Sequence, residues 1–288
     1  MQKCPSASSG MAGKAESCKG CPNANICASS KPDEDIPAIQ KNLKQLKLIL
    51  AILSGKGGVG KSTIARNIAS RVAAMGIRTA ILDFDLSGPS IPRLTKTENE
   101  FVFRSDCSFA PIVTEEEIGV ISIGHLDDQT RVFNTNTKNY AIKKILKHCD
   151  FSGYDVMVVD TPPNITEEHL ALVNYVRPQY SIMVTTPQNL SLNDVRRQIA
   201  FCNKAGMSIM GMVENMKNFH CPRCSHINVV YPNSGIEEFC KNENIEYFGS
   251  IPLNKELAKN SDSGDAFNHR VFDDISSRIC AKLIDRPT

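Results

Sequence analysis

The residues best suited to chemistry form a glycine-rich stretch that follows an apolar run. The stretch fits the pattern G-x-x-x-x-G-K-[ST] and reads Gly55, Lys56, Gly57, Gly58, Val59, Gly60, Lys61, Ser62. In this pattern backbone N–H groups surround phosphates, the last lysine reaches the β- and γ-phosphates, and the hydroxyl binds Mg²⁺. A strand pattern precedes the loop and a helical pattern begins at Thr63, which is the context the motif requires. The sequence therefore predicts a nucleoside triphosphate site.

A second lysine, Lys56, makes this loop more specific. The string K-G-G-V-G-K-S resembles the deviant Walker A loop of the superclass of ATPases that includes MinD, ParA and the nitrogenase iron protein. The resemblance implies ATP as the nucleotide and a dimer in which Lys56 crosses to the partner's nucleotide. There it would neutralise charge that develops during hydrolysis, as an arginine finger does.

Carboxylates follow two of the predicted strands. Asp83 and Asp85 end strand 79–84, and Asp160 ends strand 156–159. Because the carboxyl ends of parallel strands face the ligand crevice, these side chains belong near the nucleotide. Their positions match switch I and switch II of the superclass, so we expect Asp85 to orient the attacking water. Asp83 and Asp160 would hold Mg²⁺ through its water molecules. An alternative to these roles, strongest for Asp83, is that the carboxylate only caps the next helix.

Four cysteines lie close together near the start of the chain. They are spaced C-x13-C-x2-C-x5-C, at Cys4, Cys18, Cys21 and Cys27. Four thiolates suffice for a [4Fe–4S] cluster or for tetrahedral zinc, and the spacing leaves both open. Residues 1–45 have almost no large apolar side chains, so we expect an extension that either stays disordered or is ordered by what it binds. An ATPase domain over residues 46–288 would follow.

A second cysteine pair, Cys221 and Cys224, has the spacing C-x2-C. One chain thus supplies two thiolates where a cluster needs four, and a two-fold dimer would bring two pairs together. We therefore predict a [4Fe–4S] cluster that bridges two subunits. The neighbouring His220 and His226 leave open a zinc site within one chain, and a redox role is a further alternative.

Strand and helix patterns alternate from residue 46 onward. Strands are expected at 46–53, 79–84, 112–113, 120–123, 156–159, 180–184, 209–213 and 245–248, and helices at 63–75, 136–149, 192–204 and 271–284. This alternation predicts an α/β fold with a doubly wound, mostly parallel sheet covered on both faces.

Composition narrows the function classes. The net charge is +2 without a basic block, and no apolar run approaches the roughly 20 residues of a membrane-spanning helix, so we expect no nucleic-acid or membrane partner. The first residues have neither an apolar signal core nor an arginine-rich presequence pattern, which predicts a cytosolic protein and leaves the nucleus open. In a reducing compartment the 11 cysteines favour metal ligands and buried thiols over disulfides.

Together these features resemble the Mrp/NBP family of iron–sulfur scaffold ATPases, in its eukaryotic cytosolic branch with an N-terminal four-cysteine extension. Besides the cysteines and the loop, the matching stretches are Asp83-Phe84-Asp85 with Gly88-Pro89-Ser90, Asp160-Thr161-Pro162-Pro163 with Glu168-His169-Leu170, Thr185-Thr186-Pro187-Gln188 with Asp194-Val195-Arg196, Val213-Glu214-Asn215-Met216, and Gly249-Ser250-Ile251-Pro252-Leu253. In one departure, Asn164-Ile165-Thr166 stands where the family usually has Gly-Thr-Ser.

The resemblance implies slow ATP hydrolysis, a stable N-terminal [4Fe–4S] cluster and a labile bridging cluster. The clusters would pass to cytosolic and nuclear apoproteins with the help of targeting factors. The assembly would be a homodimer or a heteromer with a paralogous scaffold ATPase. It further implies that Asn215 reads the adenine edge and that the Pro252 loop packs on the base. Two other functions stay open: a positioning ATPase like MinD or ParA, and a zinc-stabilised nucleotide switch.

Overall fold

The computed structural model describes residues 14–19, 33–100, 104–105, 108–125, 135–221, 223–224, 226–231 and 235–284. Cys4, Cys21 and Cys27 lie outside the described residues, so the N-terminal four-cysteine site stays a prediction. Cys18 is described, at the end of the short 3-10 helix η1 (Glu16–Cys18).

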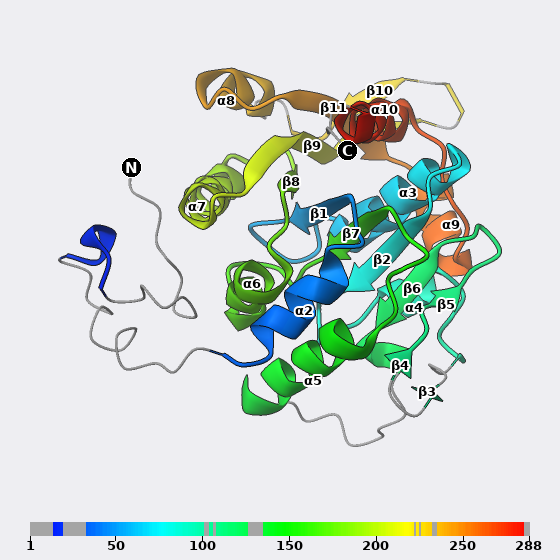
Figure 1. Cartoon of the computed structure of the whole chain (residues 1–288). Coiled ribbons are helices and arrows are strands. Elements are labelled where there is room, and N and C mark those ends of the chain that lie inside the picture. The colour runs from blue at the N-terminus through cyan, green and yellow to red at the C-terminus, as the bar shows by residue number, and fades with distance from the viewer. Residues whose placement is uncertain are drawn as a thin grey trace.

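A mostly parallel sheet forms the centre of the described part of the chain (Figure 1). Its strand order is β10-β9-β8-β1-β7-β2-β6-β5, with β11 paired to β9. The strands are β1 (Leu48–Leu53), β2 (Thr79–Asp83), β5 (Ile112–Val113), β6 (Gly119–Ser122), β7 (Val156–Asp160), β8 (Tyr180–Thr185), β9 (Ser208–His220), β10 (Ile227–Val229) and β11 (Tyr247–Leu253). Only β5 and β10 pair antiparallel to their neighbours in this sheet. The predicted α/β fold with a mostly parallel sheet is confirmed.

Helices cover both faces of this sheet. The longer helices are α2 (Ile36–Leu43), α3 (Lys61–Ala74), α5 (Thr135–His148), α7 (Asn189–Ala205), α9 (Lys255–Ser263) and α10 (Arg270–Ile284). The shorter elements are α4 (Ile91–Leu94), η2 (Ile123–His125), α6 (Glu167–Ala171), the π-helix η3 (Leu172–Val176) and α8 (Ile236–Asn242), besides a hairpin of β3 (Arg104–Ser105) and β4 (Ser108–Phe109).

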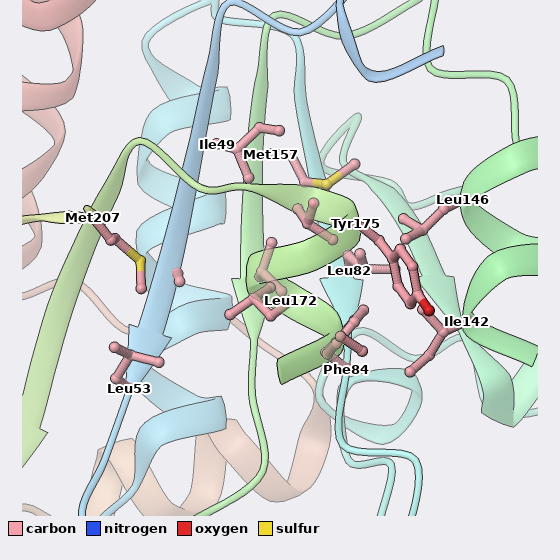
Figure 2. Close-up of a cluster of buried hydrophobic side chains, with 14 of the residues drawn as sticks. Ile49, Leu53, Leu82, Phe84, Ile142, Leu146, Met157, Leu172, Tyr175 and Met207 are labelled. Carbon is pink, nitrogen blue, oxygen red and sulfur yellow. The ribbon is translucent and has the colours of Figure 1, made fainter. Parts of the chain in front are cut away.

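The central strand β1 shows why the sheet needs both layers. All six of its residues are buried, because alternate side chains point to opposite faces. Leu48, Leu50 and Ile52 pack with α3 and α10. Ile49 and Leu53 pack on the other face, with α2, α5, η3 and α7, and Figure 2 shows part of this second cluster.

Helix α2 was not predicted. It lies within the segment assigned to the cysteine-rich extension, yet Ile39 and Leu43 are buried in the domain core. Asn42 Nδ2 donates to two carbonyls at the end of α5, those of Leu146 (2.9 Å) and Cys149 (2.6 Å). The helix was missed because its two apolar anchors stand in a polar segment and become buried only against α5 and η3.

Strand β9 also differs from its prediction. It continues to His220 instead of ending at Val213, because its second half pairs with β10 and β11. This extension carries the chain directly to Cys221. Among the described residues, no helix is long and apolar enough to cross a membrane.

Candidate nucleotide site

The glycine-rich loop connects β1 to α3 and requires residues without side chains. Gly58 and Gly60 adopt positive φ angles of 76° and 83°, which glycine accepts at little cost. A Cβ atom on Gly60 would lie 2.4 Å from Asn215 Nδ2, and one on Gly55 would lie 2.9 Å from the backbone carbonyl carbon of Asp194. The loop therefore packs closely against β9 on one side and α7 on the other.

A cavity of about 440 Å³ lies over this loop. Every predicted loop residue from Lys56 to Thr63 lines it, and so does Asp85. Four residues that were not predicted as site residues also line it, from α4 and α9 and their flanks: Ser90, Arg93, Ser261 and Asp262. Ser90 belongs to a stretch matched to the family, whereas no sequence pattern marks the residues of α9. The volume lies within the range typical of small-molecule sites.

Lys61 forms a buried ion pair with Asp160 at the floor of this site. Lys61 Nζ lies 2.5 Å from Asp160 Oδ1, and the side chains are 7% and 0% exposed. Burial raises the pKa of Asp160, and the Lys61 ammonium opposes that rise. Among the described residues Asp160 Oδ2 has no hydrogen-bond partner. The register of the sheet explains why Asp160 contacts Lys61. Asp160 is paired with Ile52 near the end of β1, and the loop that leads to Lys61 follows this strand.

Asp83 is buried one strand further along, paired in register with Asp160. Its Oδ2 accepts the Ile91 N–H at the start of α4 (3.2 Å) and the Ser122 hydroxyl (3.2 Å), and its Oδ1 accepts the Asp85 N–H (3.2 Å). Burial, and next the neighbouring Asp160 carboxylate, raise the pKa of Asp83 to about 8. These contacts match the helix-capping alternative and leave the predicted role in Mg²⁺ binding as a prediction.

Asp85 differs from Asp83 in facing the cavity. It is half-buried, and its Oδ1 accepts the Gly88 N–H at 3.2 Å, which closes the turn after β2. A carboxylate exposed to the cavity at this position can contact a water molecule, which is what its predicted role requires.

Lys56 is held within its own chain. Its Nζ donates a hydrogen bond to Gln188 Oε1, on the residue that precedes α7. Gln188 Nε2 in turn donates to the Tyr231 hydroxyl at 3.1 Å. Gln188 belongs to a stretch matched to the family, but no sequence pattern predicts its contact with Lys56.

Neither of the two residues predicted to contact adenine belongs to the described cavity lining, and Asn215 contacts the loop from behind it on β9. Asn215 is buried on β9, and its Nδ2 donates to the Val59 carbonyl at 2.8 Å. Pro252 is half-buried on β11. The described lining of the cavity includes neither residue, so their roles toward the base stay predictions.

The changed residues Asn164 and Thr166, at the position matched to switch II, fit the local backbone. Asn164 has a φ of 62°, in the left-handed region that favours glycine and tolerates asparagine. Thr166 and His169 form a capping box at the start of α6. Lys138 of α5 joins the two switches, donating to Ser87 Oγ (2.9 Å) and Glu168 Oε1 (2.6 Å). Asn164 thus adopts a backbone conformation that asparagine tolerates, and Thr166 serves as the N-cap of α6.

The second cysteine pair lies on a hairpin formed by β9 and β10. Cys221 is half-buried and Cys224 is exposed, and the Cys221 N–H donates to the His226 carbonyl at 2.9 Å. Backbone N–H groups, first that of Arg223, lower the pKa of the Cys221 thiol. The described residues contain no group of three or more His, Cys, Asp or Glu side chains placed to hold a metal ion. One chain therefore does not assemble the zinc alternative with His220 and His226 among its described residues.

A phosphate loop after the central strand of a parallel sheet, with carboxylates at the ends of the next strands, defines a P-loop NTPase of the MinD and ParA class. More specifically, the chain belongs to the ParA family of NUBPL iron-transfer P-loop NTPases, whose model matches residues 45–286. The family predicted from the motifs is confirmed.

Two curated relatives extend over nearly the whole chain. The chain is 37% identical over 295 residues to a protein of Brugia malayi described as a cytosolic Fe-S cluster assembly factor NUBP1 homolog, covering 98% of this chain and 95% of that protein. It is also 37% identical over 301 residues to the homolog of the same description from Caenorhabditis briggsae, covering 97% and 96%.

Solved structures agree with the fold. A nucleotide-binding protein from Archaeoglobus fulgidus, in complex with ADP, superposes with a TM-score of 0.70 and 30% identity over 82% of this chain and 92% of that chain. The cell division ATPase MinD of Pyrococcus furiosus superposes with a TM-score of 0.59 and 17% identity over 82% and 99%, a likeness that shows the fold alone.

Proposed function

We propose that this protein is an ATP-hydrolysing scaffold that assembles [4Fe–4S] clusters in the cytosol and transfers them to apoproteins. The observation that carries the proposal is an accessible cysteine pair on a hairpin of the same domain that holds a two-lysine phosphate loop. The names of both curated relatives, as cytosolic Fe-S cluster assembly factors, support it.

The nucleotide half of the mechanism begins with the Lys61–Asp160 pair. Lys61 Nζ lies 2.5 Å from Asp160 and 3.4 Å from Ser62 Oγ, so one of its three N–H donors is left, and it would turn toward the β- and γ-phosphates of ATP. Backbone N–H groups of the loop would hold the remaining phosphate oxygens. Asp85 would orient the attacking water from the open side of the cavity.

The oxygen donors beside the loop fit Mg²⁺. Ser62 Oγ lies beside the lysine, and the buried Oδ2 of Asp160 is unpartnered among the described residues. These two groups would hold the ion, Asp160 through water. Mg²⁺ would supply charge neutralisation between the β- and γ-phosphates. Asp83 is already engaged by three donors, so its part would be to fix the switch I turn.

Hydrolysis would require a second subunit. The proposed step for Lys56 is to leave Gln188 and contact the nucleotide of the partner, where it stabilises transition-state charge. Homodimers and heteromers with a paralogous scaffold both satisfy this requirement. The family's P-loop chemistry would then run slowly, since the assembled site exists only in the closed dimer.

The cluster is the cargo of this cycle. Cys221 and Cys224 would supply two of the four thiolates of a cubane cluster, and the partner's pair would supply the others. Apolar side chains exposed on and beside this hairpin are typical of a contact surface: Phe219 (40%), Ile227 (51%) and Val229 (58%). Cys4, Cys18, Cys21 and Cys27 would hold a second cluster in the extension.

The C-terminal helix α10 does not support the alternative function, a membrane-positioning ATPase like MinD. A MinD-like anchor would need a free apolar face on the C-terminal helix. Val271, Phe272 and Ile275 of α10 are instead buried against the sheet. No residue described here favours that rival.

The test is reconstitution of the full chain with iron and sulfide without oxygen. We expect a brown protein with about six irons per chain, four in the extension and half of a shared cubane. Cys221→Ser with Cys224→Ser should remove about two of these irons, whereas the matched control Cys280→Ser should keep them all. Transfer of iron to an apoprotein should require ATP and fail in Lys61→Ala. A colourless protein with stoichiometric zinc would instead support the nucleotide-switch alternative.

A further inference from the structure

One side chain touches both the phosphate loop and the cysteine hairpin. Gln188 accepts a hydrogen bond from Lys56 Nζ through its Oε1 and donates one from Nε2 to the Tyr231 hydroxyl, 3.1 Å away. Both bonds use the same planar amide, so the orientation that serves one serves the other. All three side chains are half-buried, which shields these contacts in part from water.

The backbone around Gln188 is fixed relative to the loop. Gln188 precedes α7, and its N–H donates to the Thr186 carbonyl at 2.8 Å while its own carbonyl accepts the Ser191 N–H at 2.9 Å. Further along α7, Gln198 Nε2 donates to the Ser54 carbonyl at the start of the loop, at 3.2 Å. The backbone that carries the Gln188 side chain is therefore held against the loop, whereas the side-chain amide is held by its bonds to Lys56 and Tyr231.

Tyr231 lies at the base of the hairpin that bears the cysteines. It follows β10 by two residues, and β10 pairs antiparallel with residues 218–220 of β9. The same ribbon carries Cys221, whose N–H is bonded to His226. Strand β10 is three residues long and lies at the edge of the sheet, so a tether just after it affects how often it opens.

We propose that Gln188 is a positioning residue that couples the nucleotide site to the cysteine pair. While Lys56 stays in its own chain, the amide of Gln188 is held and fixes Tyr231 and the hairpin. When Lys56 leaves, the amide loses its charged partner and can rotate, and the tether on Tyr231 weakens. This inference rests on the proposed crossing of Lys56 to the partner's nucleotide. It adds the route by which that movement reaches the cluster ligands.

The test measures backbone hydrogen–deuterium exchange in the nucleotide-free, cluster-free full chain, so it depends on neither hydrolysis nor iron. Lys56→Ala should raise exchange several-fold in the peptide spanning 218–231. Tyr231→Phe, which removes only the hydroxyl, should raise it by a similar factor. If one path carries both effects, the double mutant should match either single mutant instead of multiplying them.

Two further variants distinguish positioning from general loosening. Gln188→Leu keeps the size of the side chain but removes both hydrogen bonds, so it should reproduce the Lys56→Ala result. Gln188→Glu can accept from Lys56 and from the Tyr231 O–H, so it should restore the slow exchange of the wild type. Tyr140→Phe is the matched control, because Tyr140 is exposed on α5. Exchange in α10 serves as the internal reference.

Three outcomes would overturn the coupling: unchanged hairpin exchange in Lys56→Ala, multiplied effects in the double mutant, or fast exchange in Gln188→Glu equal to that of Gln188→Leu. Failure of the reconstitution experiment would leave this measurement intact, because the hairpin is monitored in the apoprotein. Conversely, a negative exchange result would leave the scaffold function standing and remove only this route between its two sites.

Discussion

Lys61 and Asp160 are paired within 2.5 Å at the floor of the nucleotide cavity, although they are 99 residues apart in the chain. Both side chains are nearly inaccessible to solvent, so each is the other's main compensation for burial. Lys61, the predicted phosphate-binding lysine, thus also stabilises a buried carboxylate.

We predict that Lys61→Ala abolishes ATP binding and also lowers stability, by about 3 kcal/mol, since it leaves a buried carboxylate without its partner. Adding Asp160→Asn should recover most of that stability without recovering ATP binding. Urea unfolding and calorimetric titration measure the two effects separately. If the double mutant is no more stable than Lys61→Ala, the ion pair is not the source of the loss.

For Lys56 we predict normal ATP binding and much slower hydrolysis after substitution by Ala. A mixing experiment shows whether the lysine acts across the interface. Lys56→Ala subunits keep Lys61 and can bind ATP, and Lys61→Ala subunits keep Lys56 and can supply it. A mixture of the two inactive proteins should therefore hydrolyse ATP. A mixture that forms dimers but stays inactive would argue for action within one chain.

Asp85→Asn should bind ATP and fail to turn it over, because an amide is a poor acceptor for orienting the attacking water. The cavity provides a matched control in Asp262, another lining carboxylate, which lies on α9 and follows no strand. Asp262→Asn should keep turnover close to that of the wild type. Single-turnover hydrolysis at saturating ATP makes the comparison, and equal rates in the two variants would remove Asp85 from its assigned role.

Asp83 should make the folded protein less stable as the pH rises. Its pKa is about 8 in the folded state, above the value of 3.8 for the free group, so the folded state retains a proton that the unfolded state loses. The stability contribution of this proton is complete below about pH 4 and is lost as the pH rises through 8. Asp83→Asn should flatten the stability profile over this range, and an unchanged slope would contradict the assignment.

The folded domain should begin before α2. Asp33 accepts a hydrogen bond from the Tyr175 hydroxyl at 3.1 Å and pairs with Lys143 at 2.5 Å, and α2 buries Ile39 and Leu43. A chain starting at residue 31 should therefore unfold at nearly the same urea concentration as the full chain. A chain starting at residue 46 should lose about 4 kcal/mol, from two large buried side chains. Equal stability of the two truncations would contradict this boundary.

The sequence by itself determined the phosphate loop, the order of the main strands and of the four predicted helices, and the family, but it did not predict α2. These features depend on local patterns: glycines required by the turn, apolar runs at strand spacing, and lysines at fixed offsets from the glycines. Asn164 stood out in the sequence only as a departure from the family, and its left-handed φ of 62° was seen only in the structure.

Only the tertiary structure decided which of these residues meet. Sheet register brings Asp83 and Asp160 side by side and makes Asp83 a buried, capping group, whereas Asp85, two positions further on, faces the cavity. The packing of α7 on the loop puts Gln188 between Lys56 and Tyr231. Lys56 is 132 positions and Tyr231 is 43 positions away from Gln188 in the chain. No local pattern encodes such contacts, because they arise from the crossing of segments distant in sequence and from the burial that those crossings create.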